Sequence, residues 1–201
     1  MLGAEVKKRR FGVGEYHRMA EAGILGEDDR VELVHGEIVE MTPIGSRHHA
    51  CVMRLNRMLV EYCASSEAGD YIVSVQGPLL LDESNEPQPD VAVLRGRADF
   101  YEEDLPAAAD ALLVIEVSDT TLAYDRNVKL PLYAGASVPE AWIVDLGRRR
   151  VELYANPAAG VSGPLSYTST KSFVEGEEVR SLVLPSLVLP VREILGGVGR
   201  P

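Results

Sequence analysis

Residues 111–145 read ALLVIEVSDTTLAYDRNVKLPLYAGASVPEAWIVD, two apolar runs separated by a segment long enough for a helix. The first run, LLVIEV, is almost wholly apolar, as expected for a central strand that is buried on both faces. We predict a helix from about Tyr124 to Tyr133 and a second strand at EAWIVD. A strand, a helix and a strand in this order predict a βαβ crossover, which joins two parallel strands of one sheet.

Hairpin strands and helices flank this crossover in the sequence. VELVHGEIVEM alternates apolar and polar residues around His35-Gly36, which predicts a hairpin. Helices are predicted from about Gly14 to Ile24 and from Ser46, the expected N-cap, to Cys63. Further strands are predicted at YIVSV, PLLL and DVAVLR, and from Arg149 the chain becomes β-rich (RVELYA, LSYTS, EEVRSLVL) before it closes with PVREIL.

Together these elements predict an α/β or α+β fold, a central mixed β-sheet flanked by helices with a β-rich C-terminal tail. We expect one domain over residues 1–201, with a core at about 14–146 and a β-rich extension at about 147–195. No Pro/Gly/Ser-rich linker divides the chain into two apolar patterns. The composition, 46% hydrophobic and 25% charged, is typical of a soluble globular domain.

Composition also excludes several classes of protein. No apolar run approaches the roughly 20 residues that span a bilayer, and the basic start MLGAEVKKRR lacks the apolar region of a secretory signal. We therefore expect a cytoplasmic protein without a membrane partner. Cys51 and Cys63 fall about 18 Å apart on one predicted helix, too far for a disulfide, and neither has zinc-site spacing. The net charge of −11 argues against nonspecific nucleic-acid binding by the whole surface, so such binding needs a local basic groove.

Asp90, Glu116 and Lys129 are the candidate catalytic residues, because each lies at the edge of an apolar run. Ligands gather beyond the carboxyl ends of strands in open α/β sheets, and the crossover can bring the lysine back over the strand that bears Glu116. Two acids and an amine at one point can hold a divalent cation beside a phosphodiester and neutralise charge on the attacked phosphate. The alternative is a buried ion pair without catalytic function, since Asp125 and Lys129 have the favourable i,i+4 spacing.

The chain resembles the Uma2 family of restriction-endonuclease-like nucleases, formerly catalogued as a domain of unknown function. The blocks that carry the resemblance are VELVHGEIVEM, SRHHACVMRLNRML, EPQPDVAVLR, the whole of residues 111–145 and LVLPSLVLPVREIL, in the order and spacing of the family. The resemblance implies a PD-(D/E)xK nuclease core in which Pro89-Asp90 is the PD half. It further implies a DNA substrate and a homodimer, which provides two sites for two strands.

One position departs from the wider superfamily pattern. Ser118 stands where the (D/E)xK motif has its lysine, and in this family a lysine on the next helix replaces it, here Lys129. The implied mechanism places Mg²⁺ (or Mn²⁺) on Asp90, Glu116 and the carbonyl of Val117, where the ion lowers the pKa of a bound water. Lys129 is expected to orient or activate that water, and Asp125 to orient Lys129.

Two more residues match family positions. Glu32, in the hairpin block, is expected to be an extra ligand or orienting group, and the alternative is an exposed strand carboxylate. His48, at the start of the long helix, is expected to contact phosphate or water, and the alternative is a polar surface residue.

A basic stripe on the long helix is the candidate substrate groove. At about 100° per residue, Arg47, Arg54 and Arg57 fall within an arc of roughly 80°, one face of the helix, which can follow a phosphate backbone. Glu61 shares that face, so a solvated stripe is the competing explanation.

The predicted function is a metal-dependent endonuclease that hydrolyses DNA. A catalytically silent nucleic-acid-binding or assembly protein with the nuclease fold is the first alternative, and an enzyme of the same type acting on RNA is the second. The joint presence of Asp90, Glu116 and Lys129 favours the enzyme, because a silent relative is free to lose any of them.

Overall fold

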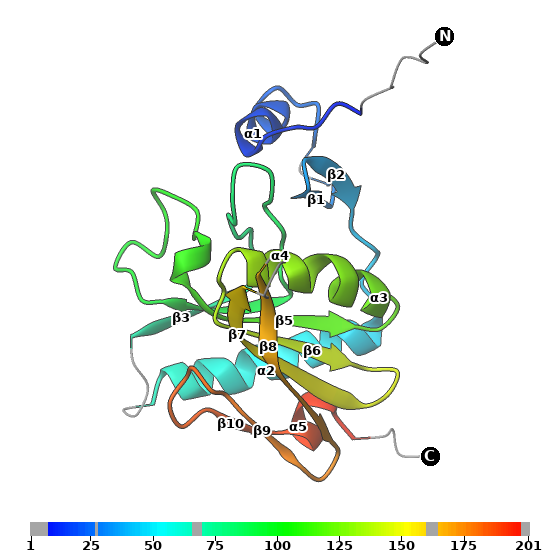
Figure 1. Cartoon of the computed structure of the whole chain (residues 1–201), viewed down its shortest axis with the longest axis vertical. Helices are drawn as coiled ribbons and strands as arrows, with labels where there is room; N and C mark the ends of the chain where they lie inside the picture. Colours follow the sequence, from blue (N-terminus) through cyan, green and yellow to red (C-terminus); the bar gives the residue numbers. More distant parts are fainter. Residues whose placement is uncertain (1–7, 27, 66–69, 160–164, 198–201) are drawn as a thin grey trace.

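A six-stranded mixed β-sheet forms the centre of the protein, with strands in the order β3-β4-β5-β6-β7-β8 (Figure 1). The computed structural model describes residues 8–26, 28–65, 70–159 and 165–197 of the 201. The strands of the sheet are β3 (Tyr71–Val75), β4 (Val91–Arg95), β5 (Ala111–Ser118), β6 (Glu140–Asp145), β7 (Arg150–Ala159) and β8 (Leu165–Val174). The predicted fold class, a mixed sheet flanked by helices, is confirmed.

β5 and β6 are parallel, as the crossover pattern predicts, and every other neighbouring pair in the sheet is antiparallel. Glu116 lies opposite Ile143, and Ser118 lies opposite Asp145. All residues of β5 and β6 are buried, which explains their unbroken apolar runs. The shared register brings the carboxyl ends of both strands to the same edge of the sheet.

The crossover helix between β5 and β6 contains a π-helical turn. It runs through α3 (Leu122–Tyr124), the π-turn η2 (Asp125–Lys129) and α4 (Leu130–Gly135), so the predicted helix exists and starts two residues earlier than expected. The N–H of Leu130 donates to the carbonyl of Asp125, five residues back. Pro131 explains the wider turn, because proline has no N–H to donate and its ring crowds the carbonyl four residues before it.

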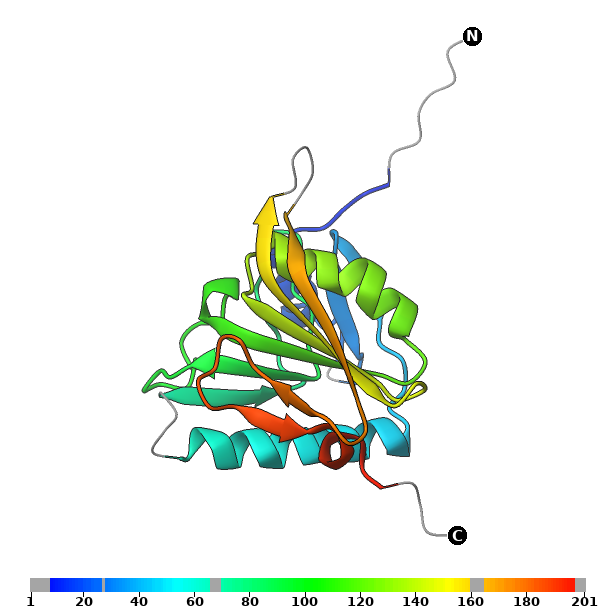
Figure 2. The same cartoon turned by 60° about the horizontal axis from the view of Figure 1, so that its bottom comes forward.

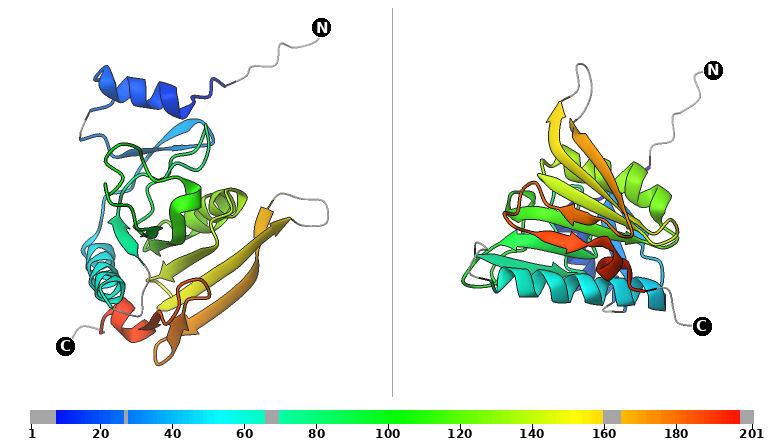
Figure 3. Two further views of the ribbon diagram at one scale, coloured as in Figure 1. Left: turned by 90° about the vertical axis from the view of Figure 1, so that its left-hand side faces the viewer. Right: turned by 90° about the horizontal axis from the view of Figure 1, so that it is seen from below.

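Helices lie on both faces of the sheet (Figure 2), and an apolar cluster is buried on each face. On one face, α2 (Ser46–Cys63) and α5 (Val191–Leu195) pack against the sheet, with Leu55, Leu59 and Trp142 fully buried between the layers. On the other face, α4 packs over the sheet, with Tyr133 fully buried. The views from the side and from below show the sheet between α2 and the crossover helix (Figure 3).

The predicted hairpin is also confirmed, as β1 (Val31–Val34) and β2 (Glu37–Glu40). Its turn residues His35 and Gly36 both have positive φ, 53° and 70°, which is the geometry of a two-residue hairpin turn. A bridge between Leu33 and Glu86 attaches the hairpin to the segment before β4. α1 (Val13–Glu21) precedes it and ends three residues before the predicted Ile24.

Some predicted boundaries are wrong. The PLLL segment forms no strand, and Leu80 makes only an isolated bridge to Ala107, just before the short helix η1 (Ala108–Asp110). Gly45, not Ser46, is the N-cap of α2.

The predicted β-rich extension is in fact part of the central sheet, because β7 pairs along the whole of β6 and β8 pairs along β7. Only β9 (Glu178–Arg180) and β10 (Val188–Pro190) form a separate two-stranded ribbon. Among the described helices, none is long and apolar enough to cross a membrane.

Candidate active site

A pocket of about 520 Å³ opens at the carboxyl end of β5. The elements around it are the β1–β2 hairpin, the start of α2, the residue before β4, and the crossover helix. The charged and polar side chains that line it include Glu32, His48, Asp90, Glu116, Tyr124 and Lys129. The fold therefore brings the predicted acids and the predicted amine to one pocket. The most distant of them in the sequence, Glu32 and Lys129, are 97 positions apart (129 − 32 = 97).

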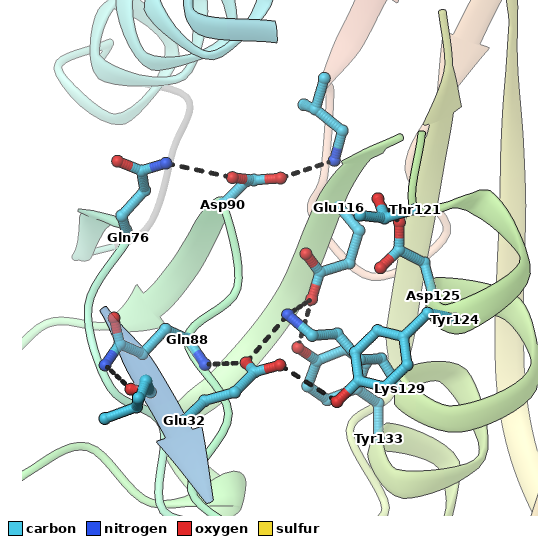
Figure 4. Close-up of polar contacts among 12 residues, drawn as sticks. Glu32, Gln76, Gln88, Asp90, Glu116, Thr121, Tyr124, Asp125, Lys129 and Tyr133 are labelled. Carbon is cyan, nitrogen blue, oxygen red and sulfur yellow. Dashed lines mark hydrogen bonds and ion pairs between the residues drawn. The ribbon is translucent and has the colours of Figure 1, made fainter. Parts of the chain in front are cut away.

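The side chain of Asp90 takes the place of the backbone carbonyl that would pair with Val117 if the ladder between β4 and β5 continued. The ladder between β4 and β5 ends at Val91 opposite Ile115, and the N–H of Val117 then donates to Oδ2 of Asp90 at 2.9 Å. The imidazole Nε2 of His48 lies 3.0 Å from the same oxygen. Asp90 is thus a fixed carboxylate that lines the pocket, held from the end of β5 and from α2. Figure 4 shows Asp90 with its neighbour Gln76.

Gln76 holds Asp90 from the other side. Its side-chain amide donates to Oδ1 of Asp90 at 3.3 Å, and its N–H donates to the Asp90 carbonyl at 3.1 Å. Gln76 adopts a left-handed backbone conformation, φ 50°, which costs a non-glycine residue about 1 kcal/mol or more. Such strain is retained where the surrounding structure fixes the residue, and here it turns the chain after β3 toward Asp90.

Lys129 lies between two carboxylates. Its Nζ is 3.1 Å from Oε2 of Glu32 and 3.2 Å from Oε1 of Glu116, and only 5% of the residue is exposed. The hydroxyl of Tyr133, one helical turn further along the crossover, donates to the same Glu116 oxygen at 2.5 Å. The spatial prediction that an amine on the crossover returns over the end of β5 is therefore met (Figure 4).

The electrostatics of this group follow from its burial. Burial raises the pKa of the Glu116 carboxyl to about 8, although the Lys129 ammonium acts in the opposite direction. Burial alone would lower the pKa of Lys129, but the attraction of Glu116 and Glu32 outweighs it, so the pKa of Lys129 is raised. Lys129 is accordingly charged at all working pH values, while Glu116 is a carboxyl whose charge depends on nearby cations.

Glu32 is a buried member of the site, 2% exposed, so the alternative of an exposed strand carboxylate is wrong. The N–H of Gln88 donates to its Oε2 at 3.1 Å, and the hydroxyl of Tyr124 donates to its Oε1 at 3.2 Å. The bridge between the next residue, Leu33, and Glu86 fixes the hairpin at this depth.

Asp125 does not hold Lys129 as the i,i+4 spacing predicts. Its Oδ2 accepts hydrogen bonds from the hydroxyls of Ser118, at 2.6 Å, and Thr121, at 2.7 Å, and no ion pair with Lys129 occurs within the described part of the chain. The Ser118 and Thr121 hydroxyls hold the carboxylate of Asp125, while Glu32 and Glu116 hold the ammonium of Lys129. Asp125 instead fixes Ser118, the last residue of β5.

His48 is largely buried beside Asp90, so it is not a polar surface residue. The hydrogen bond to Asp90 raises the pKa of the imidazole, against the effect of burial. Its Nδ1 atom is buried without a hydrogen-bond partner among the described residues. His48 therefore orients a predicted metal-binding carboxylate from α2 and lines the pocket.

The predicted arginine stripe on α2 separates into three different environments. Arg47 donates to the carbonyl of Leu146 at 2.9 Å at the margin of the pocket. Arg54 is bound to the carbonyls of Ile194 and Leu195 at 2.9 and 3.0 Å, where it caps α5, and Arg57 pairs with Glu61 on the helix surface. The side chain of Arg54 is occupied by the fold, so the stripe is not a continuous groove, and only Arg47 borders the pocket.

Several residues of the site were not predicted from the sequence. Gln76, Gln88, Tyr124 and Tyr133 have no spacing pattern that marks them, although Gln88 falls in the EPQPD block next to Asp90. The described residues contain no group of three or more His, Cys, Asp or Glu side chains arranged to hold a metal ion. The residues that line the pocket include Asp90, Glu116 and Val117.

Comparisons with known proteins show the family and the fold of this chain. The crystal structure of "a putative nuclease belonging to DUF820" from Anabaena variabilis ATCC 29413 is similar to this chain, with a TM-score of 0.65 and 14% sequence identity. The match covers 87% of this chain and 95% of that one, and at this identity it shows a shared fold. No curated protein matches the chain. The Uma2 pattern, described as "Putative restriction endonuclease", matches residues 13–192, and the chain therefore belongs to the Uma2 family.

Proposed function

We propose that this protein is a metal-dependent endonuclease that hydrolyses DNA phosphodiester bonds in the pocket at the end of β5. The observation that carries the proposal is the meeting of Asp90, Glu116 and Lys129 in one pocket, with Lys129 paired to Glu116 at 3.2 Å. Membership of a family described as restriction endonucleases supports a nucleic-acid substrate.

The donor set fits Mg²⁺ or Mn²⁺. Asp90, Glu116 and the carbonyl of Val117 are oxygen donors, which these hard cations prefer, and waters complete the shell. Glu116 is a buried carboxyl with a raised pKa, and a nearby dication stabilises its charged form. When bound, the ion neutralises phosphate charge and lowers the pKa of a bound water.

The side chains around the pocket have separate tasks in this proposal. His48 and Gln76 hold Asp90 in one orientation, and Tyr133 does the same for Glu116. Lys129 supplies a permanent positive charge toward the phosphate, where charge develops in the transition state. Glu32 keeps the Lys129 ammonium in place through the 3.1 Å contact, independently of Glu116.

The experiment is nicking of supercoiled plasmid by the purified protein with Mg²⁺, with Mn²⁺ and with a chelator. We expect cleavage that requires the metal and that is lost in Asp90→Asn and in Lys129→Ala. Glu103→Gln is the matched control, because Glu103 is an exposed carboxylate outside the pocket. Full activity of Lys129→Ala refutes the role of the amine.

Binding of Mn²⁺ is measured in parallel by calorimetry and by the shift of the melting temperature. Absence of both nicking and Mn²⁺ binding would favour the alternative, a catalytically silent nucleic-acid-binding or assembly protein. The homodimer remains a prediction, which light scattering of the full chain tests.

A further inference from the structure

Four arginines gather at the turn between β6 and β7, beside the pocket. Guanidinium nitrogens of Arg126, Arg148 and Arg150 lie 3.7, 3.5 and 3.6 Å from Oδ2 of Asp145. Arg47 reaches the same turn from α2 through its 2.9 Å hydrogen bond to the carbonyl of Leu146. We call Arg47, Arg126, Arg148 and Arg150 the arginine rim.

The rim is continuous with the margin of the pocket. Arg47 is 3.4 Å from the carboxylate of Asp119, which lines the pocket, and Arg126 directly follows Asp125, which also lines it. The N–H of Leu146 donates to the carbonyl of Ser118, so the turn that bears Arg148 extends the end of β5.

The acids under the rim are buried and the rim arginines are more exposed than these acids. The side chains of Arg126 and Arg150, which both pair with Glu152, are 27% and 29% exposed. The side chain of Asp145 is 3% exposed and that of Glu152 is 7% exposed, whereas the side chains of Arg47 and Arg148 are each 61% exposed. Positive charge is therefore presented to solvent and negative charge is withdrawn below it. In the pocket, by contrast, carboxylates form much of the lining itself.

The guanidinium groups also keep unused donors. Oδ2 of Asp145 has no hydrogen-bond partner among the described residues, because its three arginine neighbours remain at ion-pair distances. Arg126 uses two of its donors on Glu152, at 2.9 and 2.5 Å. Each guanidinium has five N–H groups, so Arg47 and Arg148 retain several that point away from the protein.

We propose that the arginine rim binds the phosphodiester backbone of DNA next to the phosphate that is cleaved, an inference that rests on the proposed endonuclease function. The fork of N–H donors on arginine matches two oxygens of a phosphate, and the group stays charged at every working pH. The rim is the local basic surface that a protein of net charge −11 needs in order to approach a polyanion. The occupant is DNA backbone, because the rim adjoins a pocket assigned to a phosphodiester.

The experiment is binding of a fluorescein-labelled DNA duplex, measured by anisotropy in chelator so that no cleavage occurs. Arg47→Ala and Arg148→Ala are compared with wild type between about 50 and 200 mM salt. Arg95→Ala is the matched control, because Arg95 is an exposed arginine at the end of β4 opposite to Asp90. Arg148→Lys keeps the charge and loses the fork, and melting temperatures of all variants check folding.

We expect Arg47→Ala and Arg148→Ala each to reduce the magnitude of the negative slope of log K against log salt by about 0.9. This change corresponds to about eightfold weaker binding at 0.1 M salt. Arg95→Ala is expected to bind as wild type does, and Arg148→Lys to keep the salt slope with weaker binding. Equal weakening by all three alanine variants, wild-type affinity in the rim variants, or absence of binding by wild type would each overturn the proposal. Mn²⁺ calorimetry and plasmid nicking of the wild type judge the endonuclease function separately, since neither readout involves this duplex.

Discussion

Replacing Lys129 by methionine is the sharpest test of the charge arrangement at the site. The substitution keeps the length of the side chain and removes the ammonium that lies 3.1 Å from Glu32 and 3.2 Å from Glu116. Breaking a buried pair by removing one partner costs about 3–5 kcal/mol, because it leaves an uncompensated charge. For a chain of this size that corresponds to a fall of about 6–20 °C in melting temperature.

The loss of stability in Lys129→Met depends on pH, in a direction that the pKa of Glu116 determines. Lys129 lowers the pKa of Glu116 in the wild type, so its removal raises that pKa further above the ordinary value of 4.5. A carboxyl with a raised folded-state pKa contributes stability at low pH and loses it as the pH rises through that pKa. Wild type and variant lose this stability alike up to the wild-type pKa of about 8, so the deficit of Lys129→Met is constant from about pH 5 to pH 8. It grows above pH 8, where Glu116 ionises in wild type before it does so in the variant.

Urea unfolding of wild type, Lys129→Met, Glu116→Gln and the double variant measures the effect. The double variant is expected to recover part of the loss, because glutamine removes one of the unpaired charges, and the cycle gives a coupling of about 1 kcal/mol or more. If Lys129→Met unfolds within about 1 kcal/mol of wild type at pH 8, the ammonium is not the counter-charge of these carboxylates and the reasoning fails.

Three further predictions concern neighbouring groups. Tyr133→Phe removes the hydrogen bond to Glu116; we expect it to lower kcat in plasmid nicking more than it raises KM and to cost about 1–3 kcal/mol of stability in urea. Trp142 is the single tryptophan and donates to Glu140 at 2.7 Å. Burial raises the pKa of Glu140, so tryptophan emission should titrate with a midpoint above 4.5, and Glu140→Gln should abolish that transition. Leu59→Ala, in the fully buried face of α2, is expected to destabilise the protein by about 2–5 kcal/mol in urea unfolding, and a smaller loss means that the cavity refills.

The crossover and its parallel strands were predictable because two buried strands leave unbroken apolar runs that little else explains. Glu116 was equally visible, since a carboxylate within such a run must have a partner. The same reasoning gave a wrong strand at PLLL, because Leu79 is buried, and Leu81 partly buried, by packing of a loop rather than by strand pairing. A run of apolar residues predicts that a segment is buried. It does not predict whether a neighbouring strand is present to pair with that segment.

The polar partners of the site were beyond the reach of the sequence. Asp125 bonds to the hydroxyls of Ser118 and Thr121 rather than to Lys129, a choice between partners that the i,i+4 spacing does not contain. Tyr133 and Gln76 reach their carboxylates only because the crossover and the turn after β3 have a particular pitch. Such contacts depend on three-dimensional register, which residue spacing alone does not contain.

The acidic balance of the chain, −11, is compatible with a polyanionic substrate because charge acts locally. At physiological salt, exposed charges farther apart than about 8 Å are largely screened, so a bound strand responds mainly to the groups at its own path. In the pocket, Lys129 is the counter-charge of Glu32 and Glu116, and Asp90 is one of the further acids that line it. At the rim, Asp145 lies under three guanidiniums and sets their positions without presenting its own charge to solvent. The same carboxylates that make the protein acidic thus organise the positive charge that a phosphate meets, and net charge by itself is no guide to the substrate.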